Sequence, residues 1–157
     1  MDRIKIRKNF GFALCKGEEQ YCSFSMASMT GRWGLSIAKN TGNSNYNVWI
    51  YYHHLHELSK EVKRWIRKMD ELIEQFEMFN KRVALRRNFG IGRCRGSSQK
   101  CSYCECNMSN KIGLSISKQT SRTSYNIWIC LDCLPQFARQ LRRWQLRYEP
   151  DIIIEAL

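Results

Sequence analysis

The chain has 157 residues, of which 43% are hydrophobic and 12% aromatic, a composition that excludes wholesale disorder and allows a packed interior. No apolar run approaches the roughly 20 residues of a membrane span, and the N-terminal stretch lacks the hydrophobic segment of a secretory signal. Lys and Arg outnumber Asp and Glu by 26 to 14, which indicates a polyanionic partner.

The positive charge lies in two stretches that are separated by an acidic one. Residues 82–147 contain 13 Lys and Arg against two acidic residues, and residues 3–67 contain 11 against four. Residues 68–81 and the last ten residues are each net negative. The distribution therefore points to two basic modules.

The two basic stretches repeat one pattern. A shift of 79 residues aligns residues 3–66 with 82–145 without a gap, and 24 of the 64 aligned positions are identical. RKNFG aligns with RRNFG, GLSIAK with GLSISK, and YNVWI with YNIWI. We therefore expect a tandem duplication, with copies at residues 1–80 and 81–148 and an acidic, apolar tail at 149–157.

Each copy is expected to begin with a short strand, at residues 3–7 and 82–86, because the first of these stretches alternates basic and apolar residues and the second follows a similar pattern. A glycine-containing loop follows. Two strand-like runs separated by polar turn residues then predict a β-hairpin, and a helix follows the hairpin. Pro135 fits the first turn of the second helix, where its missing N–H is not needed.

The first helix is expected to run from about residue 55 to 80 and to join the two copies. Its apolar residues recur in alternating steps of three and four from Leu55 to Phe79, and the second helix repeats this spacing from Leu134 to Trp144. We expect the two helices to pack against each other within one chain. A homodimer formed through the same residues is the alternative.

The cysteines favour metal binding in a reducing, intracellular compartment, the cytoplasm or the nucleus, because no secretory signal is present. Two CxxC pairs, Cys101 with Cys104 and Cys130 with Cys133, flank the second hairpin, whose ends are adjacent. CxxC spacing lets two thiolates reach one metal ion in tetrahedral geometry at about 2.3 Å. Two disulfides or a redox dithiol are the competing interpretation.

The order of knuckle, hairpin and helix over residues 101–145 resembles the treble-clef zinc fingers. The resemblance implies one Zn²⁺ per chain, bound by Cys101, Cys104, Cys130 and Cys133. Four thiolates leave no open coordination position, so this zinc is expected to be structural. The expected fold is thus α+β, with two tandem strand–zinc-knuckle–β-hairpin–helix modules joined by a long helix, the second metal-bound and the first degenerate.

The first copy lacks a full set of cysteines. At the 79-residue offset the four ligands correspond to Cys22, Ser25, Tyr51 and His54. Serine and tyrosine are poor zinc ligands, so we expect apolar packing in place of a metal. A rearranged second metal site is the alternative, and its candidate ligands are Cys15, Cys22, His54 and His56.

Basic side chains gather on one face of each predicted helix, opposite its apolar residues. In the first helix Glu57 and Glu61 relieve this charge, whereas the second helix has Gln136 and Gln140 at those positions. An unrelieved cationic face is what phosphate contacts need, and basic residues near the second knuckle extend it. The candidate nucleic-acid contacts are Arg86, Arg87, Arg93, Arg95, Lys100, Lys118, Arg139, Arg142, Arg143 and Arg147.

The sequence therefore predicts a non-enzymatic zinc-finger protein that binds DNA or RNA mainly through the backbone, using the second copy. The first alternative is a protein-interaction or inhibitor module, monomeric or homodimeric, whose long helix or tail contacts an enzyme that processes nucleic acid. The second is a metal-dependent nuclease that uses the HHLHE cluster at residues 53–57 as its source of a general base. No catalytic residue is assigned, and no membrane partner is expected.

Overall fold

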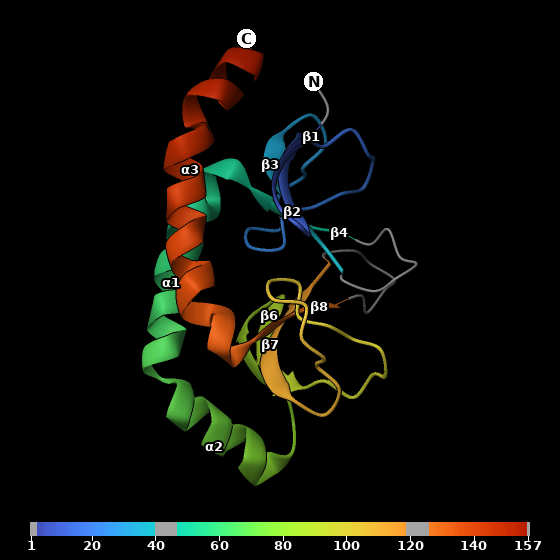
Figure 1. The fold of residues 1–157 in the computed structure, drawn as a ribbon, viewed down its shortest axis with the longest axis vertical. Helices are drawn as coiled ribbons and strands as arrows, with labels where there is room; N and C mark the ends of the chain where they lie inside the picture. The colour runs from blue at the N-terminus through green and yellow to red at the C-terminus, as the bar shows by residue number, and fades with distance from the viewer. Residues whose placement is uncertain (1–2, 40–46, 119–125, 157) are drawn as a thin grey trace.

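Within residues 3–39, 47–118 and 126–156, which this computed structural model describes, the chain forms two four-stranded antiparallel sheets and three α-helices. The α+β class predicted from the sequence is confirmed. Helices α1 (Leu55–Arg67) and α3 (Leu134–Ala156) lie side by side along one side of the molecule, and both sheets lie on the other side (Figure 1). None of the described helices combines the length and hydrophobicity needed to span a bilayer.

The first sheet is a meander in which each strand pairs with the next along the chain. Its strands are β1 (Arg3–Arg7), β2 (Phe10–Leu14), β3 (Trp33–Ala38) and β4 (Asn47–Tyr51). The opening strand and the β3–β4 hairpin agree with the sequence prediction, but β2 lies in a segment predicted as a loop. Gly11 fits this strand because the side chain of Arg3 lies where a Cβ would stand.

The second sheet has the same strand order 79 residues later. Its strands are β5 (Val83–Arg86), β6 (Phe89–Arg93), β7 (Ile112–Ser117) and β8 (Asn126–Cys130). The register agrees as well, since Phe10 pairs with Ile37 in the first sheet and Phe89 with Ile116 in the second. Equivalent residues of the two halves therefore occupy equivalent positions in their sheets.

The expected long connecting helix is two helices, so the prediction of one helix from residue 55 to 80 is wrong. Helix α2 (Met69–Phe79) begins after Lys68, whose φ of −102° and ψ of 9° lie outside the α-helical region. The break turns the chain away from α3, and α2 packs against β5 and β6 with Phe76 buried. Asn80 then ends α2 in the left-handed conformation, with φ of 48°.

The segment expected as a separate tail continues a helix. Helix α3 runs unbroken to Ala156, so the boundary expected at residue 148 falls inside it. The side chains of residues 149–157, whose apolar character suggested a docking tail, lie outside the described part of the chain.

Helices α1 and α3 cross in antiparallel orientation through two small buried residues. The hydroxyl of Ser59 donates a hydrogen bond to the carbonyl of Ala138 at 2.6 Å. Toward the other end of the pair, the Gln145 amide donates to the Tyr52 carbonyl at 3.2 Å, and the Tyr52 hydroxyl donates to the Gln145 carbonyl. The expected packing of the two helices within one chain is confirmed.

The two halves of the chain contact each other reciprocally through an arginine. Arg7 donates two hydrogen bonds to the Tyr103 carbonyl, at 3.1 and 2.8 Å, and its guanidinium lies 3.8 Å from the centre of the Tyr103 ring. Arg86, its equivalent 79 residues later, donates to the Phe24 carbonyl at 3.0 Å and lies 3.8 Å from that ring. Because Phe24 and Tyr103 are also equivalent, the contacts define an approximate two-fold axis.

Further hydrogen bonds between the halves are related by the same approximate two-fold axis. Asn9 donates to the carbonyl of Ser102 at 2.9 Å, and Asn88 donates to the carbonyl of Ser23 at 2.8 Å. The hydroxyls of Ser23 and Ser102 donate in turn to the carbonyls that end β7 and β3 of the opposite halves. Buried apolar residues of both halves form one continuous core around this contact.

Candidate metal centre and cationic surface

Four cysteines converge in the second half of the chain. Cys101 and Cys104 lie between β6 and β7, Cys130 ends β8, and Cys133 ends the short 3-10 helix before α3. Their sulfur atoms all lie within 4.8 Å of one another, and those of Cys104 and Cys130 are 3.7 Å apart. Tetrahedral coordination at about 2.3 Å would place pairs of thiolates roughly 3.8 Å apart. The cluster therefore has the dimensions needed to hold a metal ion.

Backbone N–H groups hold one of these sulfurs in place. The N–H groups of Tyr103, Cys104 and Cys130 donate to the sulfur of Cys101 at 3.3, 3.4 and 3.3 Å. These three donors fix the position of the Cys101 sulfur within the cluster. Cys101 also forms an isolated β-bridge with Trp128, which fixes the knuckle beside β8.

The protein alone favours different protonation states for the clustered cysteines. Burial acts to raise the pKa of Cys104, but hydrogen bonds from the Cys106 backbone and from neighbouring thiols lower that pKa to about 7. Burial raises the pKa of Cys133 to about 12, and it also raises the pKa of Cys130. Repulsion from the Cys101 sulfur adds to both of these increases. A bound cation would lower the pKa values of these thiols, because its positive charge favours the deprotonated form of a coordinating cysteine.

The remaining cysteines of the second half do not belong to this group of four sulfurs. Cys94 is almost fully buried, and burial raises its pKa, so it serves as a small apolar side chain. Cys106 lies close enough to Cys104 that its backbone and thiol lower the pKa of Cys104. Its position supports a ligand without adding a fifth one.

The first half keeps the knuckle geometry without the set of sulfurs. The N–H groups of Ser25 and Tyr51 donate to the sulfur of Cys22 at 3.4 and 3.2 Å, and Nδ1 of His54 lies 3.9 Å from it. The rings of Tyr51 and Phe24 pack against the His54 ring, with centroids 5.2 and 6.0 Å away. In the described part of the chain, only the four-cysteine cluster unites three or more metal-binding side chains. The structure thus does not assemble the candidate second site of Cys15, Cys22, His54 and His56.

The histidines of the HHLHE cluster point into different surroundings. His53 is exposed, and its ring packs edge-on against Tyr51 and Tyr52. His54 faces the sulfur of Cys22. His56 is half-buried on α1, and within the described residues its Nδ1 has no hydrogen-bond partner. Within the described residues, the three histidines do not form a group that could hold a metal ion.

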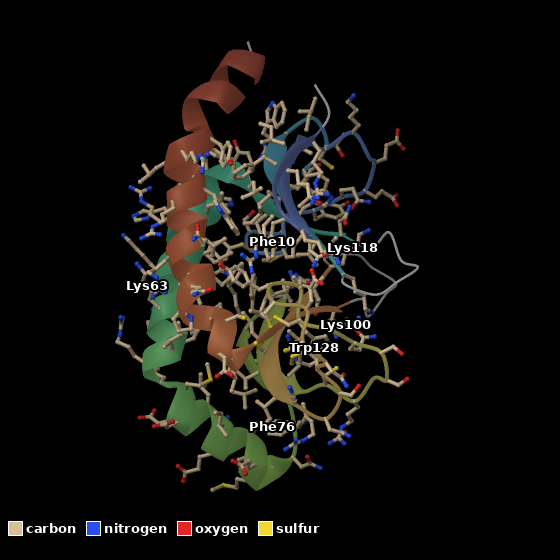
Figure 2. All side chains as sticks on the ribbon, in the orientation of Figure 1. Phe10, Lys63, Phe76, Lys100, Lys118 and Trp128 are labelled. Atoms are coloured by element: carbon tan, nitrogen blue, oxygen red, sulfur yellow. The ribbon has the colours of Figure 1, made fainter. Side chains whose placement is uncertain are left out.

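The outer side of α1 and α3, away from the sheets, is strongly basic. Figure 2 shows Lys63 pointing outward from this side of the molecule. All of its basic residues are exposed except Arg142, which is half-buried. We call this surface the helix-pair face and define it by Lys60, Lys63, Arg64 and Arg67 of α1 and Arg139, Arg142, Arg143 and Arg147 of α3.

The basic rows of the two helices meet around His56. Burial lowers the pKa of His56, and the positive charges of Arg142, Lys60 and Lys63 lower it further, against a smaller opposing effect of Glu57. Arg142 belongs to α3 and the two lysines belong to α1, so charges from both helices act on one ring. Arg142 of α3 and the two lysines of α1 are therefore close enough to act on the same ring.

The basic residues predicted near the second knuckle are dispersed. Arg86 is half-buried, its Nε donates to the Phe24 carbonyl of the other half, and its side chain lines an open pocket together with Arg64 of α1. Arg93 donates to the Asn110 carbonyl at 2.6 Å, and Arg95 donates to the Asn80 side chain at 3.2 Å. These arginines support the local structure.

Within the described residues, the side chains of the three other predicted contacts make no such hydrogen bond. Arg87 and Lys100 are exposed, and Lys118 is half-buried. Figure 2 shows Lys100 and Lys118 on the side of the molecule opposite Lys63. These two lysines are therefore not part of the helix-pair face. Of the ten predicted contacts, only the four arginines of α3 belong to that face, together with the basic residues of α1.

The residues that join the halves, above all Arg7 and Asn9, were not predicted to do so from the sequence. The available signal was their presence at equivalent positions in RKNFG and RRNFG. A polar motif that is repeated beside a strand could equally form a ligand site. Only the structure shows that this motif faces the other half of the chain. Comparisons with protein-family models, curated proteins and solved structures each found no match for this chain.

Proposed function

We propose that this chain is a non-enzymatic zinc protein that binds nucleic acid through phosphate contacts made by the helix-pair face. The observation that supports this most directly is the packing of α1 against α3, which brings the exposed basic residues of both helices to one side of the molecule (Figure 1). Solvated helices usually mix charges of both signs. Between Leu134 and Tyr148, however, α3 carries four arginines and no acidic residue.

The proposed metal is one Zn²⁺ in the four-cysteine cluster. Four thiolates at tetrahedral spacing suit zinc and exclude cations that prefer oxygen ligands. A four-sulfur site has no open position, so the ion would be structural and would anchor the start of α3, which carries half of the helix-pair face. The order of knuckle, hairpin and helix supports a treble-clef-like module.

The proposal includes a tandem duplication in which the first module has lost its metal. The shared strand order, the shared register and the reciprocal contacts support it. In the first module, aromatic packing around His54 takes the place of the ion. The fold could persist there without zinc because the metal-containing half packs against it.

The binding proposal is tested by the dependence of affinity on salt. Each neutralised phosphate releases condensed cations, so six contacts would give a slope of log K against log salt of roughly −5. Fluorescence anisotropy with labelled DNA and RNA oligonucleotides measures this slope. An affinity that stays constant between about 50 and 200 mM salt would contradict phosphate binding.

Charge-removal variants locate the surface. Replacing Arg139, Arg142 and Arg143 together with Ala should remove most binding and reduce the slope by about three units. The equivalent change of Lys60, Lys63 and Arg64 should cost less, because Glu57 and Glu61 already weaken that row. As a control on the opposite side, Lys100→Ala with Lys118→Ala should change affinity less than either triple variant.

The same samples test the proposed absence of catalysis. Incubation with Mg²⁺ should leave the labelled strand intact. Cleavage that disappears in His54→Ala would instead support the nuclease alternative, in which the HHLHE cluster supplies the general base.

A second candidate function is favoured by the exposed side of α2. Met78 and Phe79 are 69% and 66% exposed, and Asp70, Glu74 and Glu77 lie on the same short helix. An apolar end beside acidic residues suits a basic protein surface. If Met78→Ser with Phe79→Ser abolished a protein association that survives nuclease treatment, while leaving oligonucleotide binding intact, this function would be supported.

A further inference from the structure

The helix-pair face has a two-fold arrangement in addition to its charge. Ser59 and Ala138 touch at the helix crossing and are equivalent at the 79-residue offset, so the approximate axis passes between them. Both sheets lie on one side of the helix pair (Figure 1), so the axis emerges through the helix-pair face. Basic residues consequently form two-fold related pairs, namely Lys60 with Arg139, Lys63 with Arg142, and Arg64 with Arg143.

We infer that the helix-pair face binds a double-stranded nucleic acid on one of its local two-fold axes, with each half of the face contacting one strand. The inference rests on the proposed nucleic-acid function and specifies the form of the ligand. The strands of a duplex are antiparallel and are related by two-fold axes, so a two-fold protein surface can meet both backbones in equivalent ways. A single strand has direction but no such axis, and half of the face would meet it in the wrong orientation.

The dimensions of the face agree with contacts to two backbones. Arg67 lies eight residues beyond Ser59, and Arg147 lies nine residues beyond Ala138 in the opposite direction. At about 1.5 Å per residue, the basic rows extend over roughly 25 Å. Packed helices have axes about 8–10 Å apart, which is similar to groove widths of about 6 to 12 Å.

The same dimensions argue against reading of bases. Two helices side by side are about 20 Å wide, whereas the major groove is only about 12 Å wide. The pair cannot enter the groove and must lie across its edges. Contacts therefore go to phosphates, and binding should depend little on base sequence.

The face also lacks the groups on which single strands depend. Proteins that grip single strands stack bases on exposed aromatic rings. Trp65 and Trp144, the tryptophans of the helix pair, are only 5% and 6% exposed. Within the described parts of α1 and α3, the one exposed large apolar side chain is Leu146. A charged surface without stacking rings favours a duplex, whose bases are already stacked.

Two acidic residues break the symmetry of the face. Glu57 and Glu61 of α1 stand where α3 has Gln136 and Gln140, and Glu61 forms an ion pair with Arg64. The first half of the face should therefore contact its strand more weakly. Replacing both glutamates with glutamine would give the two halves the same charge and should strengthen duplex binding by about tenfold, two repulsive charges being removed.

The test compares duplexes with their own strands. The full-length, zinc-loaded protein is titrated against DNA and RNA duplexes of about 24 base pairs, two helical turns, and against the labelled single strands at equal salt. At least one duplex should bind about tenfold more tightly than its labelled strand. Single strands that bind as tightly as both duplexes would overturn the inference and leave the proposed function standing. Absence of binding to any of the probes would overturn both.

Variants of the full chain supply the control. Glu57→Gln with Glu61→Gln should tighten duplex binding more than single-strand binding. Glu18→Gln with Glu19→Gln changes the net charge equally in an exposed loop outside the face, and it should alter affinity less than about twofold. Equal gains in both variants, or a gain that is equal for both ligand forms, would overturn the two-strand arrangement.

Discussion

The contact of Arg86 with the first half gives a sharp test of how the two halves are held together. Its side chain was expected at a nucleic-acid surface, but its Nε donates to the Phe24 carbonyl at 3.0 Å and its guanidinium stacks on the Phe24 ring at 3.8 Å. Arg86→Met keeps an apolar stem over the ring while it removes the charge and the donor. The variant therefore isolates the polar part of the contact.

The expected cost follows from two losses. A hydrogen bond from a charged donor contributes about 1.5–3 kcal/mol, and a cation–π contact at a partly buried site adds about 0.5–1 kcal/mol. We expect Arg86→Met to lower the free energy of unfolding by about 2–4 kcal/mol and Tm by about 5–15 °C. Urea unfolding and thermal melting of the zinc-loaded protein measure both quantities.

Two matched variants give the comparison. Arg87→Met removes the same charge from the exposed neighbouring residue and should cost less than about 0.5 kcal/mol. Arg7→Met removes the two-fold related contact at a more exposed position and should have an intermediate effect. A loss for Arg86→Met that is no larger than the loss for Arg87→Met would refute the structural role of this arginine.

Three further outcomes are expected. Cys104→Ser should lose the metal and lower the free energy of unfolding by at least about 3 kcal/mol, whereas Cys106→Ser should keep the metal; equal metal loss in both would be contrary to the ligand set. The pKa of His56 is lowered in the fold, so the folded protein binds fewer protons at His56 than the unfolded chain does. The stabilising contribution of His56 is therefore full above about pH 6.5 and is lost as the pH falls further. The unfolding free energy of His56→Gln should thus fall less between pH 7 and 5.5 than that of the wild type, and parallel curves would argue against this. Ser59→Leu should force α1 away from Ala138 and cost about 2 kcal/mol or more, as measured by urea unfolding, and an unchanged midpoint would mean that the helices do not approach so closely.

Local sequence was sufficient to predict the elements that repeat a strong pattern. The runs GLSIAK and YNVWI, with their second copies, predicted the hairpins because β-forming residues are separated there by turn residues. The two CxxC pairs predicted the four-cysteine cluster because a hairpin brings its own ends together. In both cases the interactions that decide the structure lie within one module.

Other features could not be predicted because they depend on contacts between distant segments. Strands β2 and β6 lie in segments that the sequence predicts as loops, because Gly11 and Gly90 disfavour strands. Only the covering side chains of Arg3 and Arg82 explain why glycine fits there. The break at Lys68 has no glycine or proline to announce it. It occurs because α1 must follow α3 whereas α2 must reach the second sheet.

The predicted nucleic-acid contacts also differ in whether they depend on local sequence or on contacts between distant segments. The arginines of α3 could be placed on one face because helix periodicity is local. The position of the Arg86 side chain depends on Phe24, a residue 62 positions away, and the hydrogen bond between them exists only after the halves meet. Charge in the sequence therefore indicated a surface, but the tertiary contacts decided which charges belong to it.

Native mass spectrometry of the reduced protein, purified without added metal, tests the metal centre most directly. We expect one Zn²⁺ per chain in the wild type, and none in Cys104→Ser prepared in parallel. A wild-type chain without metal would contradict the four-thiolate centre. Two ions per chain would contradict the assignment of a metal-free first half.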